Sequence, residues 1–174
     1  MSIYEINGKK PIIGKGTWIA PSADIIGNVT IGENCYIGFG AIIRGDFGKI
    51  TVGNHSLVED AVVIHCANRV IIGNKVIIGH TAMLHDDTHV KDNALVGMQS
   101  MICDDSIISE FSIIAEKSLV MKKQVIPPKK IYGGSPAREI GDVAKKQIEK
   151  LDLGIQAYYS LIRQYHQGFK KLDI

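Results

Sequence analysis

The sequence has few cysteines, no long apolar run and no leader-like start. Its three cysteines, Cys35, Cys66 and Cys103, are odd in number and lack paired spacing, which argues against a disulfide framework or a cysteine-type zinc site. Every apolar run is shorter than the roughly 20 residues that a membrane-spanning helix needs. The first residues also lack the charged-then-apolar pattern of a signal peptide. These absences predict a cytoplasmic protein with reduced thiols and no membrane partner.

The sequence also has little net charge. A formal net charge of +2 is too small to indicate a nucleic-acid partner. The charge is uneven, however, because residues 121–174 contain 11 Lys/Arg against 5 Asp/Glu. Such an excess is typical of a solvated helix face, and an anionic ligand such as a coenzyme phosphate is the alternative interpretation.

Proline is absent between Pro21 and Pro127, which agrees with uninterrupted hydrogen bonding in a sheet. Across this stretch an aliphatic residue recurs at every sixth position. A helical period of 3.6 residues cannot produce a strict period of six, so each hexad predicts a short strand followed by a turn. Three hexads complete one triangular coil, and the 18 hexads predict an all-β solenoid of about six coils. The repeated aliphatic residues are Ile13, Ile19, Ile25, Ile31, Ile37, Ile43, Val52, Val58, Ile64, Ile72, Ile78, Leu84, Val90, Val96, Ile102, Ile108, Ile114 and Val120.

The repeat shifts its register twice, through extra residues at 44–48 and at 66–69. Insertions in solenoids commonly form loops that carry function, so we expect a loop at each place. The repeat then gives way to turn-rich sequence after Pro127. From Ile148 onward, apolar residues recur at steps of three and four, which predicts an amphipathic helix. We therefore expect a β-helix domain with a short lead-in over residues 1–126, and a linker with a helix packed on it over residues 127–174.

The hexad register also places three histidines. His65 and His85 each follow the aliphatic residue by one position on the third face, in consecutive coils, so they should stack about 4.8 Å apart. His80 follows Ile78 by two positions and belongs to the second face, around a corner. In a homotrimer, the second face of one prism could meet the third face of the next.

Three imidazoles with an open fourth position are typical of a catalytic zinc site. The pattern therefore predicts a metal bound between subunits by His65, His80 and His85. The alternative is a set of surface or interfacial histidines that bind no metal.

Charged residues accompany these histidines in the same register. Arg44 lies one coil below His65, and Asp60 lies one coil below His80. Arg44 could pair with Asp60 of a neighbouring subunit or with Asp46 of its own loop. Glu59 adjoins the same seam and is a candidate for handling protons. An interfacial network of salt bridges explains these charges equally well.

The sequence resembles the γ-class carbonic anhydrase-like proteins of the hexapeptide-repeat superfamily over nearly its whole length. The resemblance implies a trimeric left-handed parallel β-helix with a C-terminal α-helix. It also implies Zn²⁺, or alternatively Fe²⁺ or Co²⁺, bound between subunits by His65, His80 and His85. The segments that carry it are Arg44-Gly45-Asp46, Glu59-Asp60, Val63-Ile64-His65, Ile78-Gly79-His80, Met83-Leu84-His85, Val96-Gly97-Met98 and Gly134-Ser135-Pro136-Ala137.

The resemblance extends to individual positions. Arg44, Asp46 and Asp60 match the family's interfacial charged residues, and Tyr158 aligns with a helix tyrosine near the family's site. The sequence departs from the family at three positions, with Glu59 in place of glutamine, Leu57 in place of asparagine and Asp86 in place of glycine.

The family's chemistry implies a small-molecule substrate, with metal-bound hydroxide attacking carbon dioxide or a related electrophile. One alternative is a coenzyme A-dependent hexapeptide-repeat acyltransferase or an acyl-CoA thioesterase, with a histidine as general base and no metal. A further alternative is a catalytically silent metal-binding trimer.

Overall fold

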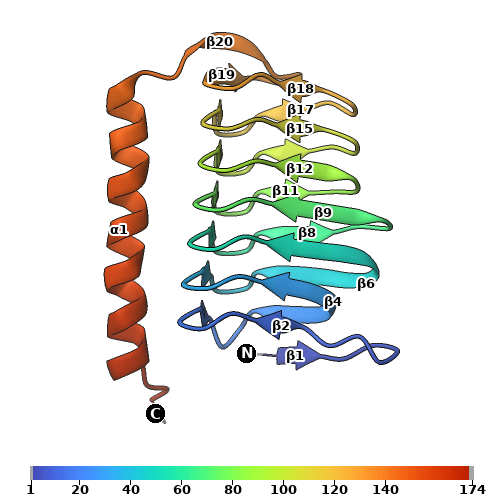
Figure 1. Ribbon diagram of the computed structural model, residues 1–174, viewed down its shortest axis with the longest axis vertical. Coiled ribbons are helices and arrows are strands. Elements are labelled where there is room, and N and C mark those ends of the chain that lie inside the picture. The colour runs from blue at the N-terminus through green and yellow to red at the C-terminus, as the bar shows by residue number, and fades with distance from the viewer. Residues whose placement is uncertain (1, 173–174) are drawn as a thin grey trace.

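The computed structural model describes residues 2–172 as a triangular β-solenoid with one long helix beside it (Figure 1). The helix is α1 (Lys145–Gly168). The strands are β1 (Ser2–Tyr4), β2 (Ile12–Ile13), β3 (Trp18–Ile19), β4 (Asp24–Ile31), β5 (Tyr36–Ile37), β6 (Ile42–Val52), β7 (Leu57–Val58), β8 (Val63–His65), β9 (Arg69–Ile72), β10 (Ile77–Ile78), β11 (Met83–Leu84), β12 (Thr88–Val90), β13 (Leu95–Val96), β14 (Met101–Ile102), β15 (Ile107–Ile108), β16 (Ile113–Ile114), β17 (Leu119–Val120), β18 (Val125–Ile126), β19 (Lys130–Gly133) and β20 (Arg138–Asp142).

The strands form a left-handed parallel β-helix, which confirms the predicted fold class. On each face, a strand pairs in parallel with the strand one coil away, as β10 does with β7 and β13. The coil has about seven turns, one more than the hexads predict. The additional turn arises because the ladders continue beyond Val120 into β18 and β19. The antiparallel partner of β19, β20, then covers the last coil before α1 begins.

The aliphatic residue of each hexad points into the prism and forms its core. Ile64, Ile78 and Ile108, one from each face, are fully buried, and they belong to a single continuous hydrophobic cluster. The coils approach closely where glycine follows the aliphatic residue. A Cβ atom on Gly53 would lie 2.5 Å from the carbonyl carbon of Gly73, so no larger side chain fits there.

The first insertion does not form the loop that the sequence predicted. Residues 44–48 lie within β6, an uninterrupted strand that crosses from the third face to the first. Its neighbour β4 crosses the same corner, and the pair between β4 and β6 accommodates the extra residues as an irregularity beyond Gly27. Backbone hydrogen bonding to the adjacent coil is therefore retained, and the insertion bends the strand instead of leaving the sheet.

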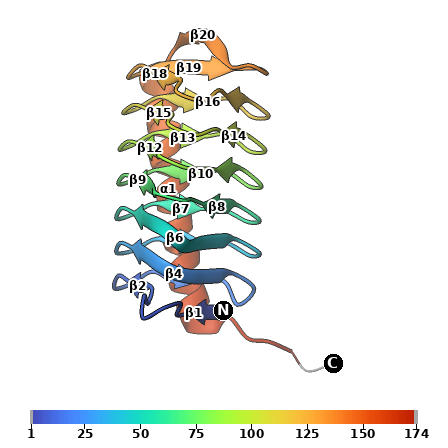
Figure 2. The same ribbon diagram turned by 90° about the vertical axis from the view of Figure 1, so that its right-hand side faces the viewer.

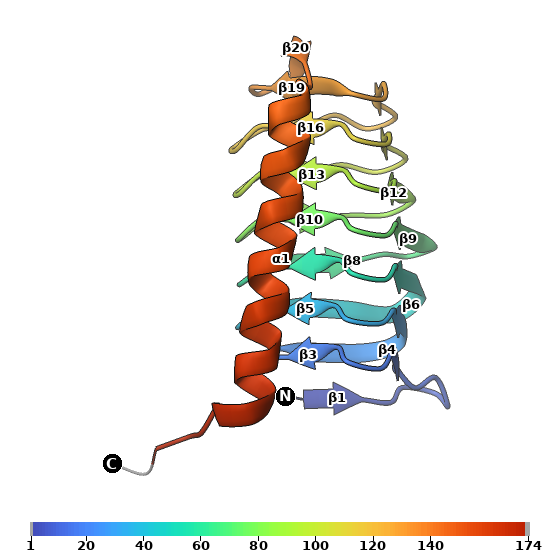
Figure 3. The same cartoon turned by 60° about the vertical axis from the view of Figure 1, so that its left-hand side comes forward.

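Helix α1 covers the second face, which is the eight-stranded sheet containing β3, β5, β7 and β10 (Figure 3). The helix is three residues longer at its start than predicted, and it buries Ile155 and Ile162. Trp18 and Tyr36 lie beneath it, with the ring centroids of Trp18 and Tyr165 4.3 Å apart. Leu57, which departs from the family pattern, is fully buried on the same face. No helix in the described part of the chain is long and apolar enough to cross a membrane.

The helix runs back along the solenoid, so the first and last described residues, Ser2 and Leu172, lie at the same end of the molecule (Figure 2). This placement changes the trimer contact that the sequence predicted. Because α1 occupies the second face, that face is not available to lie flat against the third face of a neighbour. Its edge beside the third face, where His80 follows β10, remains exposed, with 40% of the His80 side chain accessible.

Candidate metal centre

His65 and His85 lie side by side on the third face, as the hexad register predicted. β8 and β11 pair in parallel, with Ile64 opposite Leu84, so the residues that follow them are neighbours in consecutive coils. The two ring centroids are 6.1 Å apart. Arg44 lies directly opposite His65 in the coil below. The parallel ladder therefore brings two imidazoles and one guanidinium into a single outward column.

Asp46 connects the first two members of this column. Its Oδ1 accepts a hydrogen bond from Nε2 of His65 at 3.0 Å, and its Oδ2 pairs with the guanidinium of Arg44. Burial raises the pKa of Asp46, but the hydrogen bonds from Arg44 and His65 outweigh it and lower the pKa below its ordinary value. Arg44 thus pairs with the carboxylate of its own chain, one of the two arrangements that the sequence allowed.

Asp104 holds the second histidine, and sequence reasoning missed it. Its Oδ1 accepts a hydrogen bond from Nδ1 of His85 at 2.6 Å, and Nζ of Lys122 lies 3.6 Å from its Oδ2. The hydrogen bond from His85 is the main cause of a lowered Asp104 pKa. With the proton on Nδ1, a neutral His85 ring keeps the lone pair of Nε2 for a ligand. The hexad register alone does not align this pair, because Cys103 is the residue one coil above His85 and Asp104 follows it.

His80 lies apart from this pair, at the edge between the second and third faces. Its Nδ1 accepts a hydrogen bond from the backbone N–H of Asp60 at 3.2 Å, and its Nε2 lies 3.3 Å from Oε2 of Glu59. Glu59 also accepts the backbone N–H of His80. Within residues 2–172, no three His, Cys, Asp or Glu side chains converge closely enough to hold a metal ion. One chain alone therefore does not assemble the predicted ligand set.

Tyr158 reaches the same edge from helix α1. Burial, together with the nearby Glu59 carboxylate, raises the Tyr158 pKa above its ordinary value. Its ring packs edge-on against Tyr36, whose hydroxyl donates to Asp60 at 3.4 Å. The helix thus supplies a neutral phenol beside the Glu59 carboxylate.

Two residues next to the histidines have other roles. Burial raises the pKa of the Cys66 thiol to about 11, which leaves it protonated and unreactive at neutral pH. Asp86 accepts hydrogen bonds from the backbone and side chain of Asn68, at 2.8 and 3.2 Å. Asp86 therefore fixes the second insertion at 66–69 instead of extending the histidine column.

Comparisons with known proteins show which proteins this chain resembles in sequence and in fold. The family model described as bacterial transferase hexapeptide (six repeats) matches residues 10–45. A "Probable carbonic anhydrase" of Methanocaldococcus jannaschii is 45% identical over 56 residues, which are 32% of this chain and 35% of that protein. "Gamma carbonic anhydrase 2, mitochondrial" of Arabidopsis thaliana is 35% identical over 72 residues, or 41% of this chain and 26% of that protein. The chain thus aligns with only about a third or less of the length of these two relatives.

Two solved structures match along almost the entire chain. A hexapeptide transferase family protein from Anaplasma phagocytophilum superimposes with a TM-score of 0.90 at 32% identity, covering 94% of this chain and 98% of that one. A "putative acetyltransferase" of Bacillus cereus gives a TM-score of 0.91 at 32% identity, covering 94% of this chain and 96% of that one. Identity at this level over nearly complete chains, together with the hexad repeat and the left-handed coil, shows that this protein belongs to the hexapeptide-repeat transferase family.

Proposed function

We propose that this protein is a trimeric metalloenzyme that hydrates carbon dioxide or a related small electrophile. His65 and His85 of one subunit and His80 of the next would hold the ion. One observation carries the proposal: two neighbouring imidazoles, in consecutive coils, are each fixed by a carboxylate of their own chain, while the third imidazole lies around an edge. A second subunit is what would complete this set.

The donor atoms suit a divalent ion such as Zn²⁺, Fe²⁺ or Co²⁺, all of which accept imidazole. The pairing of His85 with Asp104 is the carboxylate–histidine arrangement that commonly orients metal ligands. The ring proton of His80 lies on Nε2, because Nδ1 accepts the N–H of Asp60. To bind an ion through Nε2, His80 would carry its proton on Nδ1 and give up the hydrogen bond from the N–H of Asp60, with Oδ2 of Asp60, now 3.6 Å from Nδ1, as the nearest carboxylate oxygen.

The exposed part of the third face supports contact with another copy of the chain. Ile42, Met83 and Met101 point outward there and are each about two-fifths exposed, at 37%, 38% and 44%. Ile42 and Met83 occupy the column next to Arg44 and His85. Apolar side chains beside partly exposed histidines favour a subunit interface that contains the histidines. In this arrangement the third face would meet the His80 edge of the neighbour, since α1 occupies the second face.

A divalent ion held by three imidazoles lowers the pKa of its water to about 7, which supplies the nucleophile for hydration. Hydration of carbon dioxide consumes one water and yields bicarbonate and one proton. The side chain of Glu59 is only 12% exposed and lies beside His80, so it is placed to accept that proton. Tyr158 would hold Glu59 in position, and Arg44 and Asp46 would hold the ring of His65.

The second candidate is transfer or hydrolysis of an acyl group from coenzyme A. The two matched structures at 32% identity favour it, because both are described as transferases. In this function a histidine would act as general base and no metal would be needed. The histidine bonded to Asp104 would suit that role, since the carboxylate fixes its tautomer.

Chelation separates these functions. We expect the purified protein to contain about one divalent ion per subunit, because a trimer has three equivalent interfaces. Treatment with a chelator should remove carbon dioxide hydration, and added Zn²⁺ should restore it. Acyl-CoA turnover that survives the chelator would support the second candidate instead. Bound metal without turnover of either substrate would indicate a silent metal-binding trimer.

Replacing Asp104 with asparagine tests how His85 is held. We expect Asp104→Asn to weaken metal binding by about 10–100-fold, because the ring loses its charged hydrogen-bond acceptor. Zinc affinity is measured by competition with a fluorescent chelator. Asp105→Asn is the matched control, since Asp105 pairs with Lys122 and not with a histidine. Equal zinc affinities for the two variants would show that Asp104 does not position the ligand.

A further inference from the structure

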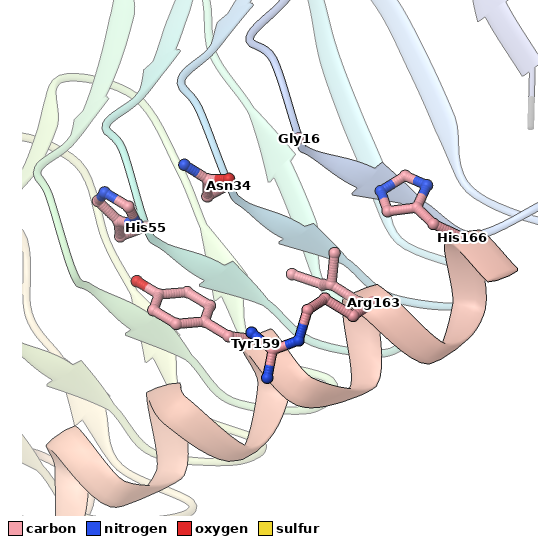
Figure 4. Close-up of a pocket in the computed structure, with 7 residues that line it drawn as sticks. Gly16, Asn34, His55, Tyr159, Arg163 and His166 are labelled. Atoms are coloured by element: carbon pink, nitrogen blue, oxygen red, sulfur yellow. The ribbon is translucent and has the colours of Figure 1, made fainter.

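A hollow separate from the candidate metal centre lies at the opposite edge of helix α1 from Tyr158. It is a pocket of about 280 Å³ between the helix and the corner that joins the first and second faces (Figure 4). Asn34 and His55 line it from the solenoid, and Tyr159, Arg163 and His166 line it from the helix. None of these residues takes part in the candidate metal centre. The pocket is therefore a separate feature of the fold.

The walls of this pocket are basic. Arg163, His55 and His166 line it, with the two histidines at opposite ends in Figure 4, and no carboxylate is among its lining residues. Arg163 forms no ion pair with any residue in the range 2–172, and Figure 4 shows its side chain extending towards Tyr159. Burial is the main cause of the raised pKa of Tyr159, and Asp152, a carboxylate that adds to the rise, does not line the pocket. A guanidinium without a carboxylate partner, beside two imidazoles, is suited to an anion.

One wall also carries an unmet hydrogen bond. Nδ1 of His55 is buried and has no hydrogen-bond partner among the described residues. The ring faces Tyr159, with the two ring centroids 5.5 Å apart. Buried polar atoms in native proteins are nearly always paired, so Nδ1 of His55 leaves this wall with a hydrogen bond that a bound group or an ordered water would satisfy.

The rest of the surroundings are apolar. Ile162 and the ring of Tyr159 line the pocket, and His166 also borders a neighbouring apolar hollow beside Ile13, Trp18 and Ile19. A ligand for this place therefore needs an apolar body as well as a charged group. At about 280 Å³ the pocket lies at the lower end of the usual range for ligand sites, which favours a small metabolite over a complete coenzyme.

From these observations we propose that the pocket binds a small organic anion, a carboxylate or phosphate monoester on an aromatic or aliphatic body. Arg163 pairs with the anionic group, one of the two imidazoles donates an N–H group to it, and the body packs against Tyr159 and Ile162. The proposal does not depend on metal binding or on carbon dioxide hydration. Arg163 is one of the basic residues that give the C-terminal segment its excess of positive charge. Part of that excess then serves to bind this anion.

The test is calorimetric titration of the full-length protein with benzoate and with phenyl phosphate, at pH 7 and constant ionic strength. Two control compounds are titrated in the same way: inorganic phosphate, which lacks the apolar body, and neutral benzamide, which lacks the charge. We expect benzoate or phenyl phosphate to bind at least about tenfold more tightly than either of them. The preferred anion then tells a carboxylate site from a phosphate site.

Variants locate the binding. Arg163→Gln should weaken binding of the preferred anion by about tenfold or more, whereas Lys150→Gln, which removes a positive charge from the same helix outside the pocket, should leave it unchanged. His55→Asn is a second variant that should also weaken binding of the preferred anion, and we expect it to fold because Asn34 and Asn93 adopt the same positive φ at equivalent corners. Thermal melts confirm that each variant folds. Absence of binding by both probes at 10 mM, or equal binding by the Arg163 and Lys150 variants, would overturn the proposal.

Discussion

Replacing His80 with alanine is expected to remove the bound metal and carbon dioxide hydration together. The proposed site has three ligands, and loss of one of them should weaken metal binding by more than about a hundredfold. Metal content is measured on the purified variant and hydration by stopped flow. His89→Ala is the control, because His89 lies on the first face, away from the column of His65 and His85. Full activity and metal content in the His80 variant would end the proposal.

Subunit mixing then tests whether the site is shared between chains. His80→Ala and His85→Ala trimers are each expected to be inactive, because every interface lacks one ligand. Unfolding and refolding an equal mixture should restore activity at about a quarter of the interfaces, where an intact His80 meets an intact His65 and His85. A site contained within one chain would give no recovery. Recovery of activity therefore distinguishes a site shared between two chains from a site in which His80 acts within its own chain.

The second large effect is expected in the core. Ile108 is fully buried between Val90 and Ile126 of the adjacent coils, so Ile108→Ala should lower the free energy of unfolding by about 2–5 kcal/mol. Val125, in the strand next to Ile108, is 57% exposed. Val125→Ala should therefore change the free energy of unfolding by less than about 0.5 kcal/mol.

Urea unfolding followed by circular dichroism measures both variants at equal subunit concentration, because assembly would add to the apparent stability. The contrast tests which column of each strand faces inward. Similar losses for the two variants would mean that the hexad register assigns the inner and outer columns wrongly.

The hexad period predicted most of the fold and the relative placement of the site residues. In a parallel solenoid, one register fixes which residues share a column, because every ladder pairs each strand with the strand one coil away. For this reason His65 and His85 were correctly placed together, with Arg44 below them and His80 around a corner. Because the pattern repeats, it predicts which residues far apart in the sequence are neighbours in space. A sequence without a repeat does not allow this prediction.

The tertiary structure alone decided the rest. The residues at 44–48 stay within a strand because backbone pairing with the next coil outweighs the expected loop. Which carboxylate contacts each imidazole depends on side-chain rotamers, so only the structure identified Asp104 as the partner of His85. Helix α1 covers the second face because Trp18, Tyr36 and Leu57 form an apolar surface there, and periodicity within the helix cannot say which face it will cover. The same docking created the pocket between His55 and Arg163, since a cavity between two elements exists only once their relative position is set.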